Sequence, residues 1–244
     1  MQIDILPTAQ AAEAYDFKGR QAVVIDVLRA TSVMTMALAN GAEAVWPVAT
    51  VDEAFLSASS LGRDRALLGG ERNADRIEGF DLGNSPQDYT TERMAGKTVV
   101  LTTTNGTLAM RNAAGADGVI VASMLNRVAV TQRLASAADS SRVAIVCSGN
   151  YGLPTLEDCL CAALLAKGVE DAGRAVAYES DYAICVRMMA EAYETGGMGW
   201  FANSVHYNRL IAKGYAADVD TCLRHDGTIS VVPRLMADGL VRVG

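Results

Sequence analysis

An acid, a base and two hydroxyl groups follow one apolar run near the start of the sequence. In VVIDVLRATS, Asp26 ends the run, and Arg29, Thr31 and Ser32 come directly after it. A carboxylate at the end of a buried strand must find a cation or several hydrogen-bond donors, because burying it unpaired costs several kcal/mol. We therefore interpret Asp26 as a functional residue rather than as a turn former.

Comparable groups follow the other apolar runs. They are acids, arginines, hydroxyl residues, amides and glycines: Gly69, Gly70, Glu71 and Arg72 in LLGGER, Thr102 to Thr107 in TTTNGT, Ser123 and Asn126, Ser148, Gly149 and Asn150 in CSGN, and Glu157 and Asp158 in LED. Glycine-turn amides cradle phosphate oxygens, arginines add charge-assisted hydrogen bonds of about 1.5–3 kcal/mol each, and carboxylates hold Mg²⁺. This inventory predicts binding of a phosphorylated anion together with a divalent metal.

Several other chemistries are excluded by missing motifs. The chain has no P-loop, no G-x-S-x-G elbow and no His or Cys spacing typical of zinc. Leu28 stands two residues after Asp26, where haloacid-dehalogenase phosphatases carry a second aspartate.

From sequence alone, each of these motifs also has a purely structural explanation. TTTNGT could simply cap a helix, GGER could be an exposed turn, and LED could place two acids at the positive end of a helix dipole. His206 lies three residues before Arg209, so the two share a helix face. Two interpretations of His206 stay open, a role in substrate binding and a purely structural role. We expect His225 on a helix surface.

Apolar runs that alternate with amphipathic segments surround these residues. We predict strands at 2–6, 21–27, 42–48, 65–72, 97–102, 117–123, 142–148 and 228–233, and helices at 30–40, 51–62, 108–115, 126–139 and 155–173, with mostly helix after 178. Residues 73–93 read as a long, ordered loop. The pattern is typical of an α/β protein with a three-layer α/β/α arrangement and a mostly parallel central sheet, in one domain spanning 1–244. Ligands of such sheets bind at the carboxyl ends of the strands.

Net charge and the lengths of the apolar stretches indicate which kinds of partner the protein does not bind. The net charge of −7, without any lysine or arginine run, argues against nucleic acid, and no apolar stretch is long enough to span a membrane. MQIDILPTAQ lacks the features of a secretion signal. Five cysteines without a C-x-x-C pair indicate free thiols in a reducing, cytoplasmic setting.

The blocks VIDVLRAT, LLGGER, GFDLGNSP, LTTTNGT, IVCSGNYG and LEDCLCA, in this order, resemble the 2-phosphosulfolactate phosphatases. The resemblance runs from about residue 20 to 165 and continues more weakly through SVHYNRL, where the usual form is closer to Ser-x-His-Gly-Arg. It implies a Mg²⁺-dependent hydrolase of coenzyme M biosynthesis, which converts (2R)-phospho-3-sulfolactate to 3-sulfolactate and phosphate. A homodimer is left open.

On this hypothesis Asp26, Glu71, and Glu157 or Asp158 hold Mg²⁺ and align a water, while Arg29 and Arg72 neutralise the phosphoryl oxygens. The predicted substrate-binding residues are Thr31, Asn84, Ser85, Thr103, Asn105, Gly106, Thr107, Ser148, Gly149 and His206. A second mechanism makes Asp26 a phosphorylated nucleophile. Two further hypotheses stay open, namely a phosphatase for another small phosphorylated acid and a non-catalytic protein that binds or senses an anion.

Overall fold

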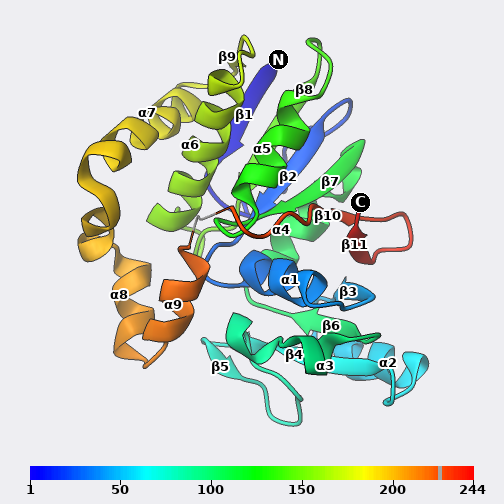
Figure 1. Cartoon of the computed structure of the whole chain (residues 1–244). Helices are drawn as coiled ribbons and strands as arrows, with labels where there is room; N and C mark the ends of the chain where they lie inside the picture. Colours follow the sequence, from blue (N-terminus) through cyan, green and yellow to red (C-terminus); the bar gives the residue numbers. More distant parts are fainter. Residues whose placement is uncertain (225–226) are drawn as a thin grey trace.

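The computed structural model describes residues 1–224 and 227–244, so His225 lies outside the described residues. Figure 1 shows the arrangement of its helices and strands. The strands are β1 Gln2–Leu6, β2 Gln21–Ile25, β3 Ala44–Pro47, β4 Ala66–Arg72, β5 Asp75–Arg76, β6 Thr98–Thr102, β7 Gly118–Ala122, β8 Arg142–Cys147, β9 Ala177–Tyr178, β10 Pro233–Leu235 and β11 Val241–Val243. The helices are α1 Ala30–Ala39, α2 Val51–Leu61, α3 Thr91–Met94, α4 Gly106–Asn112, α5 Arg127–Ala135, α6 Leu156–Asp171, α7 Asp181–Gly196, α8 Val205–Ala212 and α9 Ala216–Cys222, with 3₁₀ turns η1 Pro86–Asp88, η2 Ala113–Gly115 and η3 Gly197–Asn203.

The strands form one sheet in the order β5-β4-β6-β3-β11-β10-β7-β2-β8-β1-β9. The pairs on the β7 side (β7-β2-β8-β1-β9) and the pairs among β4, β6 and β3 are parallel. This confirms the predicted α/β class with a mostly parallel sheet.

The β10–β11 hairpin joins the two parallel halves and was not predicted. Its strands pair antiparallel with each other, with β7 on one side and with β3 on the other. The two halves therefore run in opposite senses through the sheet. Neighbouring strands rotate by about 20–25° each, so the steps from β2 to β6 turn the sheet by roughly a right angle, and Figure 1 shows β4 and β6 lying across the direction of β1 and β2. The strand expected at 228–233 begins only at Pro233.

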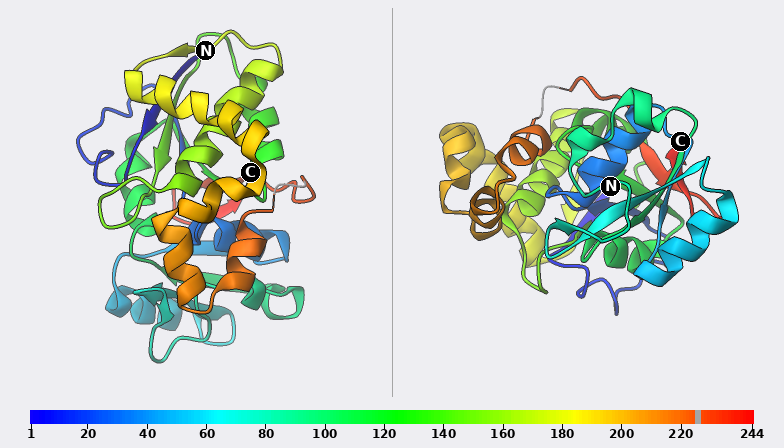
Figure 2. Two further views of the ribbon diagram at one scale, coloured as in Figure 1. Left: turned by 90° about the vertical axis from the view of Figure 1, so that its left-hand side faces the viewer. Right: turned by 90° about the horizontal axis from the view of Figure 1, so that it is seen from below.

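Helices cover both faces of the β7 side, as the two views in Figure 2 also show. On one face, α5, α6 and α7 pack on Ile3, Val23 and Ile145. On the other face, α1 and α4 pack against Val24 and Val146, and the same core continues to Val45 and Val99 of β3 and β6. Because α1 lies between the two halves, nearly all of its residues are buried. Helix α2 covers the outer face of β4 and β6 through a smaller core.

The long segment after β4 is anchored by apolar side chains. Phe80, Leu82 and Tyr89 are buried, and Leu82 bridges to Gly69 of β4. This anchoring holds Asn84 and Ser85 near the end of β2. Within the described residues, no helix combines the length and apolarity needed to cross a membrane.

Candidate active site

One cavity gathers side chains from the end of β2, the β4–β5 turn, the long loop, the turns after β6 and β8, and helix α8. Its described lining is Asp26, Leu28, Arg29, Glu71, Asn73, Ala74, Asn84, Thr103, Thr104, Asn105, Asn150, Tyr151, His206, Arg209 and Leu210. Asp26 and the TTTNGT turn, predicted to lie together, thus share one cavity.

Asp26 is buried at the start of the turn into α1. Its Oδ1 accepts a hydrogen bond from the N–H of Ala30 at 3.1 Å, and no described donor bonds to Oδ2. Burial raises the pKa of Asp26 to about 6; the hydrogen bond from Ala30 and the charge of His206 act against this, and the charges of Glu71 and Glu157 add to it. An acid held at such a cost is typical of a functional site.

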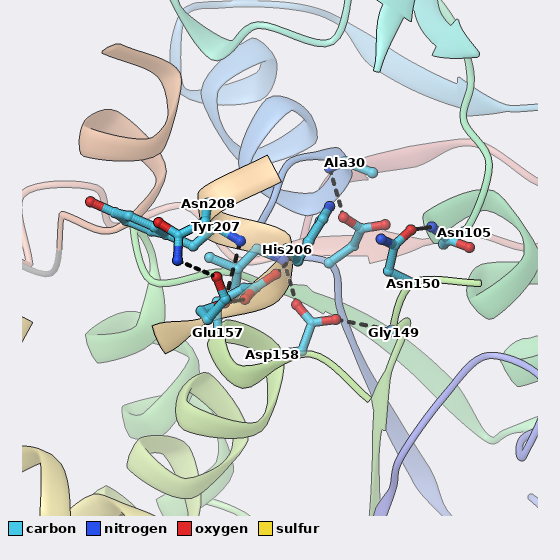
Figure 3. A network of polar contacts seen from close by, with 12 residues as sticks. Ala30, Asn105, Gly149, Asn150, Glu157, Asp158, His206, Tyr207 and Asn208 are labelled. Carbon is cyan, nitrogen blue, oxygen red and sulfur yellow. Dashed lines mark hydrogen bonds and ion pairs between the residues drawn. The ribbon is translucent and has the colours of Figure 1, made fainter. Parts of the chain in front are cut away.

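Glu157, in the first turn of α6, holds His206 of α8. The Nδ1 atom of His206 lies 2.5 Å from Oε1 of Glu157, and the hydroxyl of Ser204 lies 3.5 Å from Oε2. Glu157 is fully buried, whereas His206 lines the cavity. The contact, drawn in Figure 3, leaves the other ring nitrogen of His206 available to a ligand.

Asp158 ties the ends of two strands together. Its Oδ1 accepts from the N–H of Val27 at 2.8 Å and its Oδ2 from the N–H of Gly149 at 3.0 Å. Burial, together with the charges of Asp26 and Glu157, raises the pKa of Asp158. Gly149 has φ +65°, and a Cβ there would lie 2.5 Å from the carbonyl oxygen of Leu153, so this turn requires glycine. Figure 3 shows the Asp158–Gly149 bond beside the contact between Asn105 and Asn150.

Glu71 and Arg72 point in different directions, as neighbours on a strand do. Glu71 lines the cavity and accepts hydrogen bonds from the N–H groups of Ala74 and Thr104, both at 2.8 Å, and from the Thr104 hydroxyl. The guanidinium of Arg72 instead donates to the carbonyl of Glu71 and the hydroxyl of Thr102. Arg72 is not part of the described cavity lining, contrary to its predicted place beside the phosphoryl group.

Arg29 is held by Asp218 and Tyr215 from the C-terminal part of the chain and by Ala74 of the β4–β5 turn. Its Nη1 lies 2.5 Å from Oδ2 of Asp218, its Nη2 donates to the carbonyl of Ala74, and its guanidinium stacks over Tyr215 at 4.1 Å from the ring centroid. Ser85 donates to the other oxygen of Asp218 at 2.6 Å, so Ser85 supports this pair and is not itself in the lining.

Three residues of the TTTNGT turn, Thr103, Thr104 and Asn105, line the cavity. Thr107 does not line it; its hydroxyl lies 3.1 Å from the hydroxyl of Thr103 and holds that residue in place. A Cβ on Gly106 would lie 2.6 Å from Cβ of Ala30 and 2.8 Å from Oδ2 of Asp26, so only glycine lets α4 approach this closely.

Thr31 and Ser148, two other predicted residues, lie outside the described cavity lining. The hydroxyl of Thr31 accepts from the N–H of Asp26 at 2.9 Å. Ser148 is buried, and its hydroxyl has no hydrogen-bond partner among the described residues. Asn84 does line the cavity, and its buried Oδ1 has no hydrogen-bond partner among the described residues. An unpaired buried acceptor is costly, which points to a ligand at this atom.

The predicted metal ligands are only partly free to bind an ion. Within residues 1–224 and 227–244, no three His, Cys, Asp or Glu side chains form a ready-made metal cluster. Glu71, Glu157 and Asp158 are occupied by protein donors, whereas Oδ2 of Asp26 and Oδ1 of Asn84 have no donor among the residues that the structure describes. Mg²⁺ commonly binds through one or two protein oxygens together with waters and substrate phosphate. The residues present therefore fit Mg²⁺ in this mode.

The predicted list of substrate-binding and metal-binding residues left out several residues of the site. Asn150 follows the predicted Ser148 and Gly149 directly, and Arg209 shares the helix face of His206, so both carried a local signal. Asp218 carried none, because its contact with Arg29 joins residues far apart in the chain.

A family model and the similar proteins point to the same family. The family model for 2-phosphosulpholactate phosphatase matches residues 6–238. Proteins named "Probable 2-phosphosulfolactate phosphatase" are 39% identical in Caldanaerobacter subterraneus subsp. tengcongensis, over 93% of this chain and 92% of the relative, and 36% identical in Clostridium acetobutylicum, over 96% and 97%. A protein of the same name in Thermotoga petrophila is 41% identical over 89% of each chain. The chain belongs to the 2-phosphosulfolactate phosphatase family.

Proposed function

We propose that this chain, a phosphoric monoester hydrolase by its family, hydrolyses (2R)-phospho-3-sulfolactate to 3-sulfolactate and phosphate with the help of Mg²⁺. The observation that carries the proposal is that one cavity brings Asp26 together with Thr103, Asn105 and two arginines. A substrate with phosphate, carboxylate and sulfonate groups needs this density of donors.

The proposed orientation places the phosphate at Asp26 and the TTTNGT turn. Thr103 and Asn105 supply hydroxyl and amide donors, Thr104 is tied to Glu71 through its N–H and hydroxyl, and Arg29 supplies a guanidinium fixed by Asp218. Mg²⁺ would be held by Asp26 and Asn84, and it would offset phosphate charge and polarise the phosphorus–oxygen bonds. The residues Glu71 and Asp158 then keep the surrounding turns in place.

Two routes for the attack stay open. In one, a water attacks phosphorus; in the other, Oδ2 of Asp26 attacks, and the acyl phosphate is hydrolysed afterwards. In both, the bond from phosphorus to the C2 oxygen breaks, and that oxygen takes up a proton, for which His206, oriented by Glu157, is the proposed donor. Chemical trapping of an acyl phosphate on Asp26 during turnover separates the routes, since only attack by Oδ2 forms that intermediate.

The proposal extends to pathway and setting. The product would serve a route of the coenzyme M type, in the cytoplasm. Free thiols at all five cysteines support a reducing compartment.

Phosphate release from a panel of small phosphoesters, with Mg²⁺ and with EDTA, tests the function. We expect phosphosulfolactate to give the highest kcat/KM and EDTA to abolish turnover. Faster release from another phosphorylated acid would favour a phosphatase of different specificity. Binding of the anions without any release would indicate an anion-binding protein and contradict the proposal.

A further inference from the structure

The two arginines of the cavity differ in how much of their charge is already paired. Arg29 is buried, and Asp218 lies 2.5 Å from its Nη1. Arg209, on α8, is exposed and forms no ion pair with any carboxylate in the described part of the chain. Lys213, one turn further along, is paired with Asp75 at 2.9 Å. The charge of Arg209 is thus still available to a ligand.

Arg209 is nevertheless held in a defined position. Its Nη2 donates to the hydroxyl of Tyr151 at 3.1 Å, and its guanidinium lies 4.9 Å from the centroid of that ring. The Tyr151 hydroxyl in turn donates to Oδ1 of Asn73 at 3.1 Å. Stacking on an aromatic ring fixes the plane of a guanidinium and leaves its outer N–H groups free for an anion.

Arg209 lies between two neighbouring hollows of the surface. Together with Asn150, Tyr151 and His206, it lines both the cavity of Asp26 and a second hollow beside it. A ligand group bound by Arg209 therefore lies toward this second hollow, while the group at Asp26 and Thr103 lies within the first cavity.

The proposed substrate has a matching layout. Its phosphate and carboxylate are attached at C2, and its sulfonate is carried on the adjacent carbon. With the phosphate at Asp26, the sulfonate is the anionic group that reaches farthest from the reacting atom, one bond farther than the carboxylate. A protein with a net charge of −7 needs a local, unneutralised cation to hold such a group.

We propose that Arg209, stacked on Tyr151 between the two hollows, binds the sulfonate of the substrate and sets the preference for a sulfonated phosphoester. This assignment rests on the proposed function and adds the residue that determines specificity.

The test compares two substrates that differ only in the proposed contact. Phosphosulfolactate carries a sulfomethyl group where 2-phospholactate carries a methyl group. The ratio of their kcat/KM values is measured for the natural protein, for Arg209→Gln and for Arg209→Lys. We expect Arg209→Gln to lower this ratio at least tenfold, as loss of a charge-assisted hydrogen bond predicts, and Arg209→Lys to restore part of it.

Arg133 of α5, an exposed arginine outside both hollows, provides the matched control. Arg133→Gln should leave the ratio unchanged, which separates a local contact from a general effect of net charge. An unchanged ratio in Arg209→Gln, or an equal loss on both substrates, would overturn the sulfonate assignment while the proposed function stands. If the natural protein releases no phosphate from phosphosulfolactate, the proposed function itself fails.

Discussion

Asp26 is costly for the fold to keep. It is buried, its Oδ2 has no described donor, and its pKa is raised from 3.8 to about 6. Because one pKa unit corresponds to about 1.4 kcal/mol, ionised Asp26 destabilises the metal-free protein at pH 7 by about 3 kcal/mol. This penalty is absent below pH 3.8, grows as the pH rises from 3.8 to about 6, and is complete above about 6.

Asp26→Asn should therefore make the metal-free protein more stable while it removes activity. The amide oxygen can still accept the hydrogen bond from Ala30, and the charge penalty disappears. Urea unfolding should show a gain of up to about 3 kcal/mol at pH 7 that shrinks toward pH 4. A variant that is equally destabilised at both pH values would show that the carboxylate serves the fold.

Single residues were predictable where the polar group follows its own strand directly. Asp26, Glu71, Thr103, Asn105 and the Ser148–Gly149 turn stand at strand ends, and strand ends can be recognised from apolar runs. The sequence could not show which side of a strand end a side chain takes, so Arg72 was placed in the cavity although it bonds to Thr102. Nor could it show that Glu157 would meet His206, since that contact depends on how α8 folds back.

Between elements, the approach of α4 to α1 fixes the position of Asp26. We expect Gly106→Ala to lower kcat/KM at least tenfold, because the new Cβ would lie 2.6 Å from Cβ of Ala30 and 2.8 Å from Oδ2 of Asp26. Alanine normally stabilises a helix by roughly 0.5–1 kcal/mol relative to glycine, so propensity alone predicts no harm.

Gly115→Ala is the control for this effect, since no contacting atom of the described residues lies within 4 Å of the Cβ position there. Its activity should equal that of the natural protein. Equal activities of the two variants would mean that the α4–α1 contact does not position Asp26.

Helices and strands were predicted more accurately where their apolar pattern extended over more residues. The strands from β1 to β8 that have apolar runs, and the long helix α6, appear where periodicity placed them. The β10–β11 hairpin was missed because each strand has only three residues and pairs with partners more than 100 residues away. Short strands of this kind are set by tertiary pairing and not by local sequence.

At the scale of the molecule, this hairpin and α1 join the two halves of the sheet into one core. Val241 of β11 is fully buried and pairs with Val45, and both belong to the core that also contains Val24. The two tryptophans report on different halves, because Trp46 lies in β3 and Trp200 packs on the core under α6 and α7. Urea unfolding followed in Trp46→Phe and Trp200→Phe should give coincident transitions; two separate midpoints would show that the halves unfold independently.

Val241→Asp should lower the midpoints of both reporters, because it buries an unpaired charge at the junction of the halves, at a cost above about 2 kcal/mol. Val243→Asp is the matched control, since Val243 lies in the same strand and is 52% exposed. A loss in Val243→Asp as large as that in Val241→Asp would argue against a packing role for the hairpin.

The most direct test of the account is the rate of phosphate release from phosphosulfolactate, with Mg²⁺, by the natural protein and by Asp26→Asn under conditions where both are folded. The account predicts that the natural protein turns over and that the variant loses at least about a thousandfold, roughly 4 kcal/mol of transition-state stabilisation. A variant that retains activity within about tenfold would contradict the assignment of the cavity around Asp26 as the active site.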